Sequence, residues 1–166
     1  MILLYTGLGK GKTCACVGQA LRALGHNFKV AFAQFIKRPG QAGEQVLLAR
    51  LLGERFRVQG LGFVREADLA AHRACAKDLV VWALAQLPDL EMLILDEICY
   101  ALHYKLLTKD EVLNLIHKAQ SSNCHVICSG RFAQPWLINL ADLVTNFDSP
   151  KHPLKMGQKA LPGIEF

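Results

Sequence analysis

The chain has 166 residues, of which 52% are hydrophobic and 20% are charged. These proportions suit one globular domain spanning residues 1–166, and no apolar run reaches the roughly 18 residues that a membrane span requires. The chain begins within a predicted strand and has no signal sequence there, so we expect a cytoplasmic protein without a membrane partner. Its net charge of +5 favours an anionic partner. A polyphosphate explains that charge as well as nucleic acid does, and no basic helix or Arg/Gly tract supports nucleic-acid binding.

A glycine-rich loop follows the first apolar run, at residues 2–5. Its sequence, TGLGKGKT at residues 6–13, leads into a helical pattern, which is the strand, loop and helix order of a phosphate-binding loop. Glycines there can adopt positive φ and turn successive N–H groups toward an anion. Lys12 is expected to face the phosphates and not the core, and Thr13 to offer its hydroxyl to Mg²⁺. Thr6 stands where the strict motif has glycine, and the alternative is a glycine-rich turn that binds nothing.

The segments after the loop alternate between helical and strand patterns. Residues 14–24 carry apolar residues at helical spacing, and Gly25 is the expected C′ glycine, in the left-handed conformation just beyond this helix. Further helices are expected at residues 44–52, 67–87, 108–119 and 135–140. Further strands are expected at residues 28–35, 55–58, 92–95, 126–128 and 143–145, the last of them as a core strand. This alternation predicts a three-layer α/β fold with a mostly parallel central sheet.

Two acidic residues, Asp96 and Glu97, follow the predicted strand at residues 92–95. An open α/β sheet binds its ligands at the carboxyl ends of its strands, so the pair resembles a Walker B element that holds Mg²⁺ beside the phosphate loop. In the alternative, one acid caps a helix and only the other binds the metal. Lys37 and Arg131 also follow predicted strands, and the forked guanidinium of Arg131 suits phosphate oxygens. The alternative for Arg131 is a surface ion pair.

The six cysteines lack C-x-x-C spacing and lie in apolar or helical segments. We therefore expect reduced, buried thiols, with metal ligation as the alternative. The six histidines have no metal-binding spacing, and only His152, in the segment KHP, is expected near a site.

Motifs spread along the whole chain occur in one order. They are TGLGKGKT at residues 6–13, QFIK at 34–37, GF at 62–63, LDE at 95–97, SGR at 129–131, ADLV at 141–144, KHP at 151–153 and the closing GIE at 163–165. As a set they resemble the ATP:cob(I)alamin adenosyltransferases of the CobA/BtuR type, and the joint pattern is much more specific than any single motif.

The resemblance implies a RecA-like P-loop fold, usually a homodimer, that binds ATP with Mg²⁺ (or Mn²⁺) and a corrinoid. Co(I) attacks the 5′ carbon of ATP and the whole triphosphate leaves, which implies a separate reductase such as a flavoprotein. The residues implied in catalysis are Lys12, Phe63 and Arg131. The implied ATP contacts are Gly7, Leu8, Gly9, Lys10, Gly11, Lys12, Thr13, Cys14, Arg22, Lys37 and Arg131. The implied metal ligands are Thr13, Asp96 and Glu97, and the implied corrinoid contacts are Phe35, Gly62, Phe63 and Arg65.

Two positions depart from the family pattern. Leu8 replaces the usual asparagine of the loop, which removes one polar contact. Arg65 replaces an aromatic residue whose ring, in the family, helps displace the lower axial ligand of the corrinoid. Phe63 retains one aromatic ring for this displacement, so we expect a preference for corrinoids without a strongly bound lower ligand.

Two other functions use the same nucleotide motifs. A P-loop ATPase or small-molecule kinase would share Lys12, Thr13 and Asp96, but the sequence shows no positioned base or acceptor site for it. A noncatalytic nucleotide-binding relative of the family is the other alternative. The three differ in their products, which are triphosphate, ADP and none.

Overall fold

Six parallel strands form one central sheet in the order β3-β2-β4-β5-β1-β6. The strands are β1 (Ile2–Thr6), β2 (Val30–Gln34), β3 (Phe56–Val58), β4 (Met92–Asp96), β5 (His125–Ser129) and β6 (Leu143–Asn146). The structure, a computed structural model, describes the backbone of residues 1–166 and all side chains except those of residues 154 and 155.

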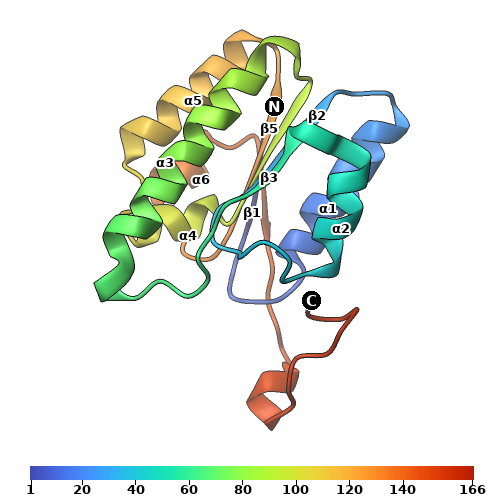
Figure 1. The fold of residues 1–166 in the computed structure, drawn as a ribbon, viewed down its shortest axis with the longest axis vertical. Coiled ribbons are helices and arrows are strands. Elements are labelled where there is room, and N and C mark those ends of the chain that lie inside the picture. Colours follow the sequence, from blue (N-terminus) through green and yellow to red (C-terminus); the bar gives the residue numbers. More distant parts are fainter.

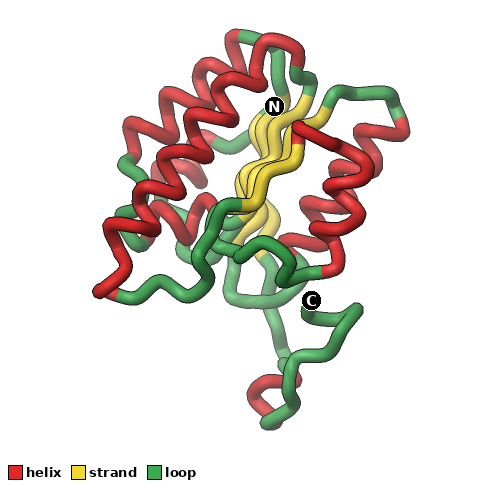
Figure 2. The backbone as a smooth tube through the Cα atoms, in the orientation of Figure 1, coloured by secondary structure: helices red, strands yellow, loops and turns green.

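Helices cover both faces of the sheet (Figure 1). One face carries α1 (Lys12–Gly25) and α2 (Gly43–Leu52), and the other carries α3 (Leu69–Gln86), α4 (Ile98–His103), α5 (Lys109–Ser121) and α6 (Pro135–Leu140). Figure 2 shows the strands as a middle layer between the two sets of helices. Short 3₁₀ turns lie at Gly53–Arg55, Glu66–Asp68, Leu87–Asp89 and Pro153–Met156. The predicted three-layer α/β fold with a parallel sheet is therefore confirmed.

The core consists of two apolar clusters, one on each face of the sheet. Strands β2 and β4 are buried at every residue, because a central parallel strand is covered on both sides. Alternate residues of β4 enter different clusters: Leu93 packs on the α3 and α5 side with Leu79 and Leu115, whereas Ile94 packs on the α1 and α2 side with Leu48. Because all the strand pairs are parallel, the carboxyl ends of the strands lie at one edge of the sheet.

Local signals in the sequence explain several element boundaries. A capping box begins α5: Glu111 N donates to Thr108 Oγ1 at 3.2 Å, and Thr108 N donates to Glu111 Oε2 at 2.7 Å. Gly53, at φ 56, follows the last residue of α2 as its C-cap.

Two local predictions were wrong, and one helix is additional. Gly25 is the last residue of α1, and Asn27, at φ 61, takes the left-handed position expected of that glycine. Strand β6 is not a core strand, because all its residues are exposed and it pairs only with β1 at the edge of the sheet. Helix α4 follows Glu97 directly, where the sequence pattern predicts no element.

The cysteines match the expectation in part. All six are free thiols. Those at positions 16, 99, 124 and 128 are buried, whereas Cys14 is exposed and Cys75 is half-buried. Within the described part of the chain, no helix is both long enough and apolar enough to cross a bilayer.

The loops after β1, β2, β4 and β5 lie together at the carboxyl edge of the sheet (Figure 1). The C-terminal segment leaves β6, extends below the sheet and turns back toward this edge. The edge therefore brings together segments that are far apart in the sequence.

Candidate functional site

The loop between β1 and α1 packs against the segment that follows β6. Gly9 N donates to Phe147 O at 2.9 Å. Gly7 has φ 104, and a Cβ there would lie 2.3 Å from Phe147 O, so only glycine fits. Thr6, which replaces the first motif glycine, is the last residue of β1, and its Oγ1 donates to Gly130 O at 3.0 Å. The threonine thereby joins the loop to the turn after β5.

The side chain of Lys12 folds back onto this loop. Its Nζ donates to Gly7 O at 2.9 Å and to Gly9 O at 2.5 Å, and the residue is only 5% exposed. Burial lowers the pKa of Lys12, against the opposing charge of Glu97. A buried ammonium needs acceptors, and Lys12 takes them from the carbonyls of the loop, outside both apolar clusters of the core. Lys12 still lines the cavity described below, so it can also face a bound anion.

Asp96 lies behind the site and not in it. The residue is 0% exposed, and its carboxylate accepts hydrogen bonds from Thr13 Oγ1 at 3.1 Å, Gln34 Nε2 at 3.1 Å and Ser129 Oγ at 2.6 Å. With these donors already bound, Asp96 orients the Thr13 hydroxyl. Its expected role as a direct metal ligand does not agree with this burial.

Lys37 connects the strand ends to α2. Its Nζ donates to Glu44 Oε1 at 2.7 Å and to Thr13 Oγ1 at 3.1 Å, and it lies 3.7 Å from Asp96 Oδ2. Burial opposes protonation, but the carboxylates of Asp96 and Glu44 outweigh it and raise the pKa of Lys37. The ammonium is held in a fixed position, charged, at the edge of the phosphate loop.

Glu97 is the acid that faces the open site. It occupies the N-cap position of α4 with φ 64, and its side chain makes no capping hydrogen bond. Burial, followed by the charge of Asp96, raises its pKa to about 7, while Lys12, Lys37 and Arg131 oppose that rise. Glu97 thus occupies the N-cap position of a helix, and it is also the acid of the pair that lines both cavities.

The donors available for a divalent cation are the Glu97 carboxylate and the Thr13 hydroxyl. Among the described residues, no group of three or more His, Cys, Asp or Glu side chains converges as a metal site. Two hard oxygen donors suit Mg²⁺, which commonly keeps water and substrate phosphates as its other ligands. The residues present therefore fit a cation that arrives with a nucleotide.

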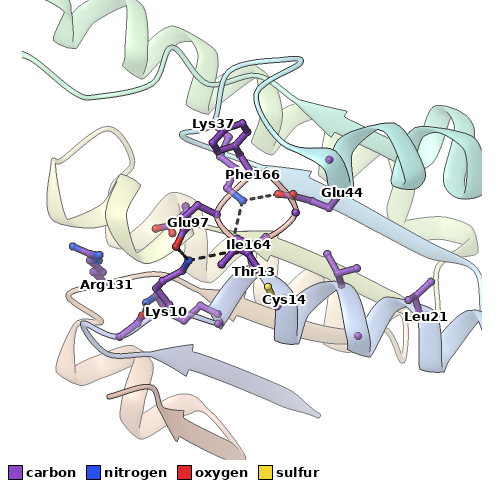
Figure 3. A pocket seen from close by; sticks show the side chains of 18 residues that line it. Lys10, Thr13, Cys14, Leu21, Lys37, Glu44, Glu97, Arg131, Ile164 and Phe166 are labelled. Atoms are coloured by element: carbon purple, nitrogen blue, oxygen red, sulfur yellow. Dashed lines mark hydrogen bonds and ion pairs between the residues drawn. The ribbon is translucent and has the colours of Figure 1, made fainter. Parts of the chain in front are cut away.

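A cavity of about 630 Å³ opens above the phosphate loop (Figure 3). Its lining includes the predicted residues Gly9, Lys10, Gly11, Lys12, Thr13, Cys14, Lys37, Glu97 and Arg131. The structure thus gathers most of the expected nucleotide contacts from the loop, from α1 and from three strand ends. Positive side chains surround an opening at a helix N-terminus, which is an arrangement suited to a polyphosphate.

A second cavity, of about 310 Å³, shares part of its wall with the first. Lys37, Glu97 and Arg131 line both cavities. The second is also lined by Gly62 and Phe63, two predicted corrinoid contacts, and the Phe63 side chain is 87% exposed. A ligand in the first cavity and a ligand in the second would therefore meet at shared side chains.

Besides the buried Asp96, five predicted site residues line neither cavity. Phe35 is 2% exposed within the core, so its ring cannot contact a corrinoid and that prediction was wrong. Gly7 shapes the loop from behind, and Leu8 is 64% exposed beside it. Arg22, on α1, and Arg65, before α3, are exposed on the surface. His152 likewise lines neither of these two cavities.

Several lining residues were not predicted. Glu44 holds Lys37, and the available signal was an acidic residue in the first turn of a helix that follows a loop. The C-terminal residues 163–166 also form part of the first cavity wall (Figure 3). There Lys10 Nζ donates to Glu165 Oε1 at 2.5 Å and to Ile164 O at 3.3 Å. The motif GIE marked this segment, but nothing local placed it beside the phosphate loop.

Solved structures support the fold. The flagellar accessory protein FlaH from Methanocaldococcus jannaschii superposes with a TM-score of 0.57 and 11% identity, over 87% of this chain and 69% of that chain. The DNA-packaging ATPase B204 from Sulfolobus Turreted Icosahedral Virus superposes with a TM-score of 0.58 and 14% identity, over 94% of this chain and 78% of that chain. At such low identity, these likenesses show the P-loop fold alone.

Curated sequences give a more specific result. The corrinoid adenosyltransferase of Pseudomonas aeruginosa is 40% identical over 100% of this chain and 83% of its own length. The corrinoid adenosyltransferase CobA of Salmonella typhimurium is 38% identical over 100% of this chain and 85% of its own length. The profile of the family "ATP:corrinoid adenosyltransferase BtuR/CobO/CobP" matches residues 1–166. With a full-length family match, two such relatives and a P-loop cavity beside a second cavity, the chain belongs to the ATP:corrinoid adenosyltransferase family.

Proposed function

We propose that this protein transfers the 5′-deoxyadenosyl group of ATP to the Co(I) of a corrinoid and releases triphosphate. The observation that carries the proposal is the shared wall of the two cavities, formed by Lys37, Glu97 and Arg131. A transfer between two bulky substrates requires adjacent sites, whereas an ATPase needs only one. Family membership supports the same reaction.

The reaction requires the protein to stabilise the negative charge of the leaving triphosphate. The electron pair of Co(I) forms the Co–C bond, the bond between C5′ and its phosphate oxygen breaks, and the triphosphate leaves with the electron pair of the broken C–O bond. Lys10, Lys12, Arg131 and the amides of the glycine loop line the cavity where this anion would lie. Preorganised positive groups of this kind stabilise the charge that develops on a leaving group.

The cation would strengthen this stabilisation. Mg²⁺ bound by the Thr13 hydroxyl and the Glu97 carboxylate would neutralise phosphate oxygens. Asp96 and Lys37 both contact the Thr13 hydroxyl, so the protein itself positions that donor. Mn²⁺ accepts the same oxygen donors.

The second cavity would receive the corrinoid. Phe63 is exposed on the loop of Gly62, whose N donates to Ile36 O at 2.8 Å, so the loop is tied to the strand end beside the cavity. An exposed ring in this position can press against the lower axial site of the cobalt. Arg65 is exposed two residues later and does not add a second apolar group.

The experiment that tests the proposal is incubation with MgATP and a chemically reduced corrinoid. The visible spectrum should change as the Co–C bond forms, and one triphosphate should appear for each corrinoid converted. ADP and phosphate in its place would establish the ATPase or kinase alternative. No product at all would favour a noncatalytic relative.

We also infer a single domain that works as a homodimer in the cytoplasm with a separate reductase, such as a flavoprotein. The exposed edge strand β6, with Leu143 at 43% and Val144 at 41% exposure, supports a second copy as its cover. Sedimentation of the purified protein at several concentrations tests the dimer, and a concentration-independent monomer contradicts it.

The inferred cytoplasmic location is supported by the six cysteines, all of which are free thiols and suit a reducing compartment.

A further inference from the structure

Four aromatic rings form a closed cluster beside the second cavity. Tyr100 and His103 lie on α4, Tyr104 is the C-cap residue of that helix, and the three follow the i, i+3 and i+4 spacing that brings side chains to one face; Phe132 comes from the turn after β5. Ring centroids lie 4.6 Å apart for Tyr100 and Tyr104, 5.1 Å for Tyr104 and His103, 4.3 Å for His103 and Phe132, and 6.3 Å for Phe132 and Tyr100. Each ring thus contacts two others, so we call this group the aromatic platform.

The platform reaches the second cavity at Tyr100, and Phe132 adjoins a residue of its wall. Tyr100 lines the second cavity itself, together with Phe63 of the loop at residues 60–63. Arg131, which lines both cavities, immediately precedes Phe132. The platform therefore borders the space where the two substrates would meet.

The backbone at Phe132 is held in an unfavourable conformation. Phe132 has φ 60, a value that few residues other than glycine and asparagine adopt, and its side chain remains 45% exposed. A strained position that also exposes a large ring does not serve core packing. Such strain is typical of functional sites, where the surrounding structure maintains it.

We propose that the aromatic platform is a second wall of the corrinoid site, with Tyr100 and Phe132 as contacts that determine corrinoid affinity. This inference rests on the proposed function. A corrin macrocycle is wide and nearly flat with apolar faces, and it extends beyond a cavity of about 310 Å³. Phe63 alone supplies one ring, whereas the platform offers a rigid apolar surface at the same opening.

The decisive variant is Phe132→Gly. Glycine adopts φ 60 without the Cβ penalty, so the variant removes the ring while relieving the backbone, and its Tm should not fall far below that of the wild type. Loss of one ring contact should weaken corrinoid binding on the order of tenfold. The dissociation constants for cob(II)inamide, followed by visible absorption, and for MgATP are measured separately. The MgATP constant should stay unchanged.

A matched control is Lys105→Gly. Lys105 has φ 57 and is exposed just after α4, so this change relieves a similar backbone strain without removing a ring. Its corrinoid constant should equal that of the wild type. Tyr100→Leu, on a different element from Arg131, should weaken corrinoid binding as Phe132→Gly does.

Two results would overturn the platform. Wild-type cobinamide affinity in both Phe132→Gly and Tyr100→Leu would mean that the rings only pack against each other. Equal weakening of MgATP and corrinoid binding would indicate a general disturbance of the site. If the wild-type protein forms the Co–C bond, either result leaves the proposed function intact and contradicts only the platform. A wild-type protein that binds no corrinoid contradicts both the platform and the proposed function.

Discussion

Replacing Lys12 by alanine tests how the phosphate loop is built. The change deletes two charge-assisted hydrogen bonds, to Gly7 O and Gly9 O, from a residue that is 5% exposed. Such bonds contribute roughly 1.5–3 kcal/mol each, but the ammonium itself is desolvated, so the net loss of stability should be about 1–3 kcal/mol. For a protein of this size that corresponds to a fall in Tm of roughly 3–10 °C. Turnover should fall about 10²- to 10³-fold, because a group that faces the leaving triphosphate is lost.

Two measurements separate these effects. Thermal unfolding without nucleotide reports the loop, and adenosylation well below the Tm of the variant reports the chemistry. Lys12→Met keeps the buried stem but not the charge, so it should recover part of the lost Tm without recovering turnover. Lys12→Ala with a wild-type Tm would refute the bracing of the loop by Lys12. The same variant with wild-type turnover would remove Lys12 from the mechanism.

Four further outcomes follow from the same site. Thr13→Ala and Glu97→Ala should each raise the Mg²⁺ concentration needed for half-maximal turnover; an unchanged requirement in both contradicts the shared ion. Because the pKa of Glu97 is raised to about 7, its contribution to stability is lost as pH rises from about 4.5 to 7. Glu97→Gln should therefore exceed the wild-type Tm at pH 8 but not at pH 4.5, and equal differences at both pH values would refute the assignment. Glu165→Gln should tighten tripolyphosphate binding, by less than about fivefold, because it frees Lys10; weaker binding in a calorimetric titration would mean that Glu165 instead positions Lys10. Phe63→Ala should depress turnover with cobalamin far more than with cobinamide, and equal losses would reduce Phe63 to packing.

Short-range sequence patterns predicted the glycine loop and the strand-end residues of the phosphate site. The order of strand, glycine loop and helix is recognisable in the sequence because the whole anion site is built within a few consecutive residues. Gly7 and Gly11, which adopt positive φ, belong to that short segment. The capping box of Thr108 and Glu111 formed for the same reason, since both partners lie in one helical turn. Parallel strands also end at one edge, so Lys37 and Arg131 were correctly expected to line one cavity.

Side-chain direction at that edge was less predictable. Phe35 and Lys37 both follow β2, yet Phe35 enters the core and Lys37 lines both cavities. Asp96 and Glu97 are adjacent, yet the first is fully buried and only the second lines the cavities. The chain path beyond a strand end sets these directions, and that path depends on the elements packed around it.

The remaining features of the site depend on contacts between distant parts of the chain. Lys10 and Glu165 are 155 residues apart, and the platform brings α4 to the turn that holds Phe132. No local periodicity of the sequence predicts these long-range contacts, because each depends on the strand order and on how the helices cover the sheet. Short sequence motifs thus determine which residues form the nucleotide site. Its cavity walls, and the exposure of β6, came from packing that only the folded chain defines.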